Sequence, residues 1–200
     1  MPSEIAQNPY KITILVLPDS SMMCIASVLE PFRAANRVAG SRLYEWQVLS
    51  LSDEEIRTTS EVSIGHDGEF NSNLRGDLLV IVAGFNQKEH VSAYALGKIR
   101  NASSGFSLVA GVEAGSWLLA RAGLLDGLSV TTHWEDFESF REAFPTTDLK
   151  YDRYVLDGKF MTCGGASPAF DMFLDLIRRR NGPAIAMEAA SVFIYDETHS

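Results

Sequence analysis

Cysteine is scarce in this sequence of 200 residues. Only Cys24 and Cys163 are present, far apart in the chain. This usage fits a reducing compartment, and we expect both residues as small buried apolar side chains. No metal-ligand spacing occurs among the two cysteines and four histidines. We therefore expect a cytoplasmic protein without a bound metal or cofactor.

Positive charge is also scarce, because 17 Lys and Arg residues face 26 Asp and Glu residues, for a net charge of -9. Such a chain is unsuited to neutralising nucleic-acid phosphates or to binding an anionic membrane surface. No apolar run approaches the roughly 20 residues of a membrane span. The N-terminal segment MPSEIAQNPYK lacks the apolar run of a signal peptide. We expect no membrane partner.

Apolar residues make up 46% of the chain, which is enough for the core of one domain over residues 1–200. Apolar runs and alternating patterns predict the following strands: 11–17, 44–51, 77–83, 106–110, 128–132, and the hairpin 153–156 with 159–163, besides a short extended pair around Val62 and Ile64. Helical spacing predicts the following helices: 22–38, 87–102, 117–122, 135–144, 167–180 and 184–194.

The alternation of strands and helices predicts an α/β fold, a three-layer sandwich with a mostly parallel central sheet. In such sheets the ligand crevice lies at the carboxyl ends of the strands. Pro31 lies inside the first predicted helix, where proline removes a hydrogen bond, and it should kink or break that helix.

The segment 108–122, LVAGVEAGSWLLARA, predicts a strand, a tight turn and a helix. The turn, bracketed by Gly111 and Gly115, places Glu113 where a nucleophile elbow carries Ser or Cys. A carboxylate is a poor nucleophile for acyl transfer, but it can hold a cation or accept hydrogen bonds. We therefore interpret the pocket as a binding site. Local capping is the alternative, since a carboxylate near a helix N-terminus is favoured by about 0.3–1 kcal/mol without a ligand.

Further ligand contacts are expected where neighbouring strands end. These candidates are Asp19, Ser20, Gly84, Phe85, Ala114, His133 and Trp134. Phe85 and Trp134 could form part of an aromatic box, since ring faces attract quaternary ammonium groups. Core packing explains the two aromatic residues as well, and helix capping explains Asp19 and Ser20. His133 could contact a ligand or only fix its loop.

Five motifs together resemble a known family. They are LEPFRAANR (29–37), the strand start Tyr44-Glu45-Trp46, AGSWLLARAGLLDG (114–127), TTHWEDF (131–137) and LDGKFMTCGGASPAFDMFLDLI (156–177). This set resembles the N-terminal sensor domain of AraC-type transcriptional regulators. That domain is similar to the class I glutamine amidotransferase-like superfamily, which includes PfpI-type proteases and isocyanide hydratases.

The resemblance implies a flavodoxin-like, class I glutamine amidotransferase-like fold. It also implies a non-catalytic domain that binds a small-molecule effector and forms a homodimer. A small amine or amino-acid-derived metabolite is the expected effector. DNA would be contacted only through a C-terminal helix-turn-helix domain, which we expect in a full-length protein and which lies outside this sequence.

Two positions depart from the pattern of catalytic relatives. Those relatives carry Cys at the elbow, where this sequence has Glu113, and the protease type places an acidic residue on the first helix, where this sequence has Cys24. An amidotransferase-like hydratase or hydrolase that uses Glu113 and His133 is the alternative function. A third possibility is a constitutive dimerisation module whose crevice is filled by Phe85 and Trp134.

Overall fold

A seven-stranded sheet lies at the centre of the computed structural model, which describes residues 8–195. Its strand order is β10-β11-β7-β6-β1-β2-β5, and every neighbouring pair is parallel except β10 with β11. The strands are β1 (Tyr10–Val16), β2 (Tyr44–Ser50), β5 (Gly68–Glu69), β6 (Gly76–Ala83), β7 (Phe106–Glu113), β10 (Tyr154–Asp157) and β11 (Phe160–Cys163). The predicted α/β fold with a mostly parallel sheet is confirmed.

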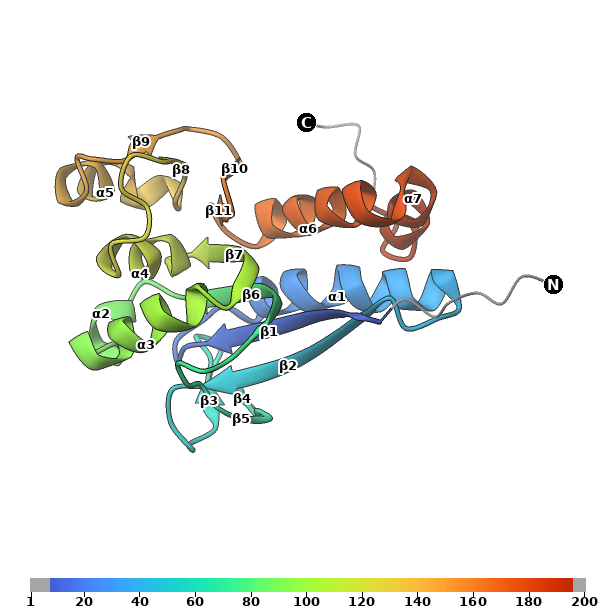
Figure 1. Ribbon diagram of the computed structural model, residues 1–200, viewed down its shortest axis with the longest axis horizontal. Coiled ribbons are helices and arrows are strands. Elements are labelled where there is room, and N and C mark those ends of the chain that lie inside the picture. Colours follow the sequence, from blue (N-terminus) through green and yellow to red (C-terminus); the bar gives the residue numbers. More distant parts are fainter. Residues whose placement is uncertain (1–7, 196–200) are drawn as a thin grey trace.

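Helices cover both faces of this sheet (Figure 1). One layer holds α1 (Met22–Ala39), α6 (Ala166–Asn181) and α7 (Pro183–Ser191), and the other holds α2 (Gln87–His90), α3 (Ala93–Ser103) and α4 (Gly115–Arg121). A 3-10 turn, η1 (Trp134–Asp136), precedes α5 (Phe137–Ala143). Within the described part of the chain, no helix has both the length and the apolar character needed to cross a bilayer.

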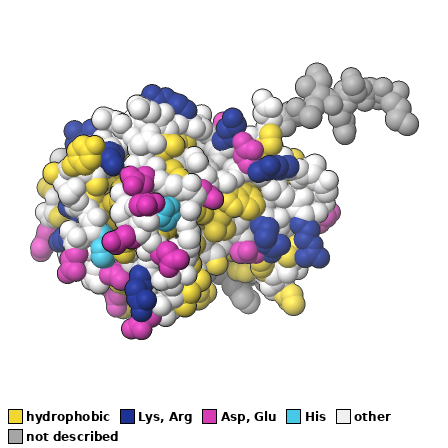
Figure 2. Space-filling view, turned by 90° about the horizontal axis from the view of Figure 1, so that it is seen from below, with side chains coloured by type: hydrophobic (Ala, Val, Ile, Leu, Met, Phe, Trp, Pro, Cys, Tyr) yellow, Lys and Arg dark blue, Asp and Glu magenta, His cyan; other side chains and the backbone are white. Residues whose placement is uncertain are grey.

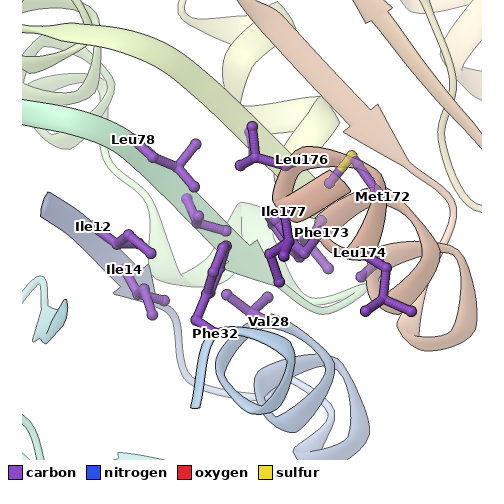
Figure 3. Packing of buried hydrophobic residues seen from close by; sticks show 14 of the residues in the cluster. Ile12, Ile14, Val28, Phe32, Leu78, Met172, Phe173, Leu174, Leu176 and Ile177 are labelled. Atoms are coloured by element: carbon purple, nitrogen blue, oxygen red, sulfur yellow. The ribbon is translucent and has the colours of Figure 1, made fainter. Parts of the chain in front are cut away.

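The central strands are apolar on both faces because both faces are buried. In β1, Ile12 and Ile14 point toward the layer of α1 and α6, whereas Leu15 belongs to the core on the opposite face. Figure 3 shows Ile12 and Ile14 opposite Phe32 of α1 and Phe173 of α6. A near-continuous apolar run is expected of a parallel strand that helices cover on both sides.

Acidic side chains gather on one half of the face shown in Figure 2, around the visible histidine side chains. Lys and Arg side chains lie around this acidic group and on the other half of the face. The excess of acidic residues in the sequence is therefore also visible as a surface property.

The predicted single helix over 87–102 is divided into α2 and α3 at Val91 and Ser92. The Ser92 side chain accepts a hydrogen bond from the Ala95 backbone N–H at 3.2 Å, which makes Ser92 the N-cap of α3. Apolar spacing continues across the division, so the periodicity alone did not reveal it. Conversely, α1 continues through Pro31 without a break, with Val28 and Phe32 on either side of it fully buried.

Two strand predictions also differ from the structure. The strand predicted over 106–110 continues to Glu113 as β7. The strand predicted over 128–132 is reduced to β8 (Ser129–Val130), which pairs with β9 (Asp148–Leu149) outside the main sheet. The short extended pair is confirmed as β3 (Ile56–Arg57) and β4 (Ser63–Ile64).

Candidate functional site

The turn between β7 and α4 is tight and strained. Glu113, the last residue of β7, has φ 56°, which is uncommon for a residue with a side chain. A Cβ atom on Gly115 would lie 2.2 Å from the Ile81 carbonyl oxygen, and one on Gly111 would lie 2.7 Å from the Ser116 nitrogen. Glycine at both positions therefore permits the close approach, and the predicted elbow geometry is present. Such strain persists only where the surrounding structure determines it.

The carboxyl of Glu113 is buried and has a hydrogen-bond donor from α1. Glu113 is 8% exposed, and the Cys24 thiol donates to its Oε2 at 2.9 Å. Burial raises the pKa of the Glu113 carboxyl, while the Cys24 hydrogen bond and the nearby His133 act to lower it. Burial and the adjacent carboxyl raise the pKa of the Cys24 thiol far above its usual range. Cys24 is therefore a neutral donor and not a thiolate nucleophile.

The pairing of Cys24 with Glu113 was not predicted, since the two residues lie 89 positions apart in the sequence. A signal for it was nevertheless present in the two departures from the catalytic pattern. Relatives of the protease type carry the acid on the first helix and the thiol at the elbow, and this chain carries the same two groups in exchanged positions.

His133 and Phe85 lie together near the elbow. Their ring centroids are 5.0 Å apart in an edge-to-face arrangement, and the His133 and Trp134 rings are 5.7 Å apart. The His133 Nδ1 accepts a hydrogen bond from the Glu135 backbone N–H at 3.3 Å, so this histidine also fixes the start of η1. Phe85 is 50% exposed and Trp134 is 70% exposed, so neither ring is buried inside a filled crevice.

The ends of β1 and β6 meet beside the same elbow. Ala83 pairs with Glu113 in the β6–β7 register, which places Gly84 next to the turn. A Cβ atom on Gly84 would lie 2.0 Å from the Asp19 carbonyl oxygen. Ala114 follows Glu113, and its N–H donates to the Ala83 carbonyl at 3.0 Å. The structure thus brings the predicted strand ends together.

Asp19 and Ser20 already have partners within the protein. The Asp19 carboxylate contacts His90 Nε2 at 2.9 Å and accepts a hydrogen bond from Asn86 Nδ2 at 3.2 Å, and both contacts lower its pKa. Ser20 is fully buried, and its hydroxyl donates to the Val82 carbonyl at 3.1 Å. Both side chains therefore stabilise the loop between β1 and α1 without a ligand.

A second carboxyl near Glu113 belongs to Asp136 of η1, which was not predicted as a site residue. Its Oδ2 accepts a hydrogen bond from Trp117 Nε1 at 3.1 Å. Burial raises the pKa of Asp136, whereas the hydrogen bond from Trp117 and the nearby His133 act to lower it, and the Asp136 carboxyl in turn acts to raise the pKa of Glu113. The sequence signal was weak, since acidic residues in a first helical turn usually serve the helix dipole. The site therefore combines the buried carboxyl of Glu113 and the half-buried carboxyl of Asp136 with one histidine and exposed aromatic rings.

The chain is similar to a known protein family and to transcriptional regulators. The DJ-1/PfpI family matches residues 11–179 of the chain. The HTH-type transcriptional regulator CdhR of Pseudomonas aeruginosa is 34% identical over 180 residues, which cover 90% of this chain and 53% of CdhR. The chain thus spans about half the length of this relative.

Two further similarities concern a solved structure and an enzyme. The crystal structure of an AraC family transcriptional regulator from Pseudomonas putida superimposes with a TM-score of 0.80 at 23% identity, covering 92% of this chain and 100% of that one. An isonitrile hydratase of Pseudomonas putida is 35% identical over 86 residues, which cover 42% of this chain and 36% of the enzyme. The first similarity concerns the whole fold, and the second concerns less than half of the chain.

Proposed function

We propose, from the premise that the chain belongs to the DJ-1/PfpI family, that it is the effector-binding domain of an AraC-type transcriptional regulator and has no catalytic activity. The observation that carries this proposal is Glu113 at the elbow. Its carboxyl occupies the position of a nucleophile, and the thiol beside it is protonated on α1. A site without an activated nucleophile is suited to binding and not to acyl transfer.

The effector we propose is a small amine or an amino-acid-derived cation. Glu113 and Asp136 supply negative charge, and a cation between them would stabilise the ionised form of both. Phe85 and Trp134 supply exposed rings next to His133, and ring faces attract ammonium groups. The backbone of Gly84 and Ala114 would line the effector site, and Asp19 and Ser20 would stabilise the loop beside it.

In the regulator, effector binding would bias the arrangement of a homodimer in the cytoplasm, and hence of a DNA-binding segment outside this sequence. The length of CdhR that this chain does not cover is consistent with such a segment. Sedimentation velocity tests the dimer directly, with a sedimenting mass of twice the monomer as the expected result.

A thermal-shift screen tests the effector proposal. The compounds are amino acids, betaines, carnitine-like amines and polyamines, each with the wild-type chain and with Glu113→Gln. A ligand at 100 times its Kd stabilises by about 2.7 kcal/mol, which is several degrees. We expect one amine to raise the melting temperature of the wild type and not that of the variant.

Glu138→Gln is the matched control, because it makes the same chemical change at an exposed carboxylate of α5. It should retain the ligand-induced shift. A shift that survives Glu113→Gln would support the sensor but return Glu113 to a local structural role. Absence of any shift would contradict an amine effector.

The second candidate is a hydratase that uses Glu113 as a general base. The raised pKa of Glu113, the nearby His133 and the similarity to an isonitrile hydratase favour it. Incubating the chain with an isonitrile and assaying the N-formyl amine, the product of adding water, distinguishes the two functions. Turnover that Glu113→Gln abolishes would overturn the non-catalytic proposal.

A further inference from the structure

The Cys24–Glu113 pair links the elbow to the first helix. Cys24 lies in the first turn of α1 and is 2% exposed. Among the described residues, the Cys24 thiol is the group that donates a hydrogen bond to the Glu113 carboxyl, and Oε2 accepts it. Glu113 ends β7 in the left-handed region, and this backbone conformation fixes the direction of its Cα–Cβ bond.

The other carboxyl oxygen, Oε1, has no hydrogen-bond partner among the described residues. Among the described residues, the side-chain nitrogen or oxygen that is both fully buried and without a partner is His66 Nδ1. Because Glu113 Oε1 also has no partner, it must be accessible to solvent. The two oxygens of Glu113 are therefore unlike one another. One is held by the protein, and the other can be reached by a ligand.

We infer that Cys24 is a positioning residue for Glu113, whose thiol holds Oε2 and thereby presents Oε1 to the effector. That this contact serves an effector rests on the proposed function. The orientation of Glu113 by Cys24 stands on the geometry alone, so the two can be tested separately.

A thiol is chemically suited to this task. It donates a hydrogen bond without carrying a charge, whereas Lys or Arg at the same place would neutralise the carboxylate. The raised pKa of Cys24 keeps the thiol protonated, so the donor is present throughout the physiological pH range. The negative charge of Glu113 thus remains available for a cationic ligand.

The titratable groups around Glu113 come from three directions. Cys24 approaches from α1, and His133 and Asp136 approach from the segment that leads into α5. Cys163, at the end of β11, lies against the backbone of Glu113, and burial raises the pKa of its thiol. Any change in the titration of Glu113 must therefore be compared between variants that leave His133 and Asp136 intact.

Carboxyl 13C NMR on the full chain tests the inference without any ligand. The Glu113 signal is identified by its loss in Glu113→Gln and is then titrated in the wild type, Cys24→Ala and Cys24→Ser. Removing the donor should raise the titration midpoint of Glu113, because the hydrogen bond favours the ionised form. Serine restores a donor and should return the midpoint to the wild-type value or below it.

Cys163→Ala is the control, because it removes a buried thiol that does not contact the Glu113 carboxyl. It should leave the midpoint in place. If Cys24→Ala fails to fold, Cys24→Val removes the donor while filling the space. A midpoint that neither Cys24→Ala nor Cys24→Val moves would overturn the inference, because a thiol that only fills space would behave in that way.

A second readout uses glycine betaine as the probe, in calorimetric titrations of the same proteins. If the wild type binds it, Cys24→Ala should weaken binding by about tenfold, the equivalent of one charge-assisted hydrogen bond, and Cys24→Ser should restore it. Equal affinity in all three proteins would overturn the role of Cys24 toward the effector. If the wild type does not bind glycine betaine, the thermal-shift screen decides the effector proposal, and the NMR titration still decides the orientation of Glu113.

Discussion

At the scale of single residues, the elbow combines a tight, left-handed backbone turn with a carboxylate side chain. The elbow keeps its left-handed residue and its two close-approach glycines, while its side chain is a carboxylate. The Cys24 thiol on α1 donates a hydrogen bond to this carboxylate. The same backbone turn can therefore present either a nucleophile or a carboxylate, and the side chain at position 113 decides which.

Gly115→Ala should destabilise the chain by about 2–4 kcal/mol or prevent its folding, because overpacking against a rigid backbone cannot relax. The added Cβ would lie 2.2 Å from the Ile81 carbonyl oxygen. Urea unfolding monitored by circular dichroism measures the loss. Gly97→Ala in α3 is the control, since no atom lies within 4 Å of its Cβ position, and it should stabilise by up to about 1 kcal/mol. Equal effects of the two changes would contradict the close approach at the elbow.

Glu113→Gln should change stability in a pH-dependent way. Burial raises the pKa of Glu113 in the folded chain above its unfolded value. Its contribution to stability is therefore present below the unfolded pKa and is lost as the pH rises through the folded pKa. Gln does not ionise, so the variant should be more stable than the wild type at pH 8, and the two should converge toward pH 4. Urea unfolding at several pH values measures this, and a variant that is less stable at pH 8 would contradict the cause assigned.

At the scale of elements, the structure differs from the sequence prediction at Ser92, which begins a new helix although the helical spacing of apolar residues continues across it. The helical spacing of 87–102 crosses Val91 and Ser92 without interruption, but the chain leaves the helix there and α3 begins anew. The position matters for the site, because α2 carries His90, which holds Asp19 at the end of β1. The N-cap at Ser92 thus determines where the chain re-enters a helix after α2.

Ser92→Ala should destabilise the chain by about 1 kcal/mol, the usual value of an N-cap hydrogen bond. The lost interaction is the one between the Ser92 hydroxyl oxygen and the Ala95 N–H. Thermal unfolding compared with Ser60→Ala, an exposed serine of the β3–β4 turn, separates the cap from a general effect of the substitution. Identical melting temperatures for the two variants would mean that α3 does not depend on this cap.

At the scale of the whole molecule, the core joins segments from the two ends of the chain. Phe32 of α1 and Phe173 of α6 lie with their ring centroids 5.3 Å apart, and both are fully buried over the sheet (Figure 3). Because α1 also carries Cys24, the packing of this layer supports the position of the thiol beside Glu113. The core and the site are therefore coupled through one helix.

Phe173→Ala should lower the free energy of unfolding by about 3–5 kcal/mol, since it leaves a cavity between α6 and α1. Chemical denaturation measures the loss. Tyr94→Ala is the aromatic control, because Tyr94 is 75% exposed on α3 and should cost little. A loss below about 1 kcal/mol for Phe173→Ala would show that this layer repacks freely.

The sequence by itself determined the class of fold, most of the strands and helices, and the elbow with Glu113 at its tip. Apolar periodicity and glycine spacing are local properties, so they can be read from neighbouring residues. Only the tertiary structure decided that Cys24 donates to Glu113, that Asp136 joins the site, and that β8 pairs with β9 instead of extending the sheet. These contacts join segments distant in the chain. The residues next to a short apolar run or a single thiol do not indicate which distant segment it will contact. Packing of α1 against the sheet brought the thiol and the carboxyl together, and with them the chemistry of the site.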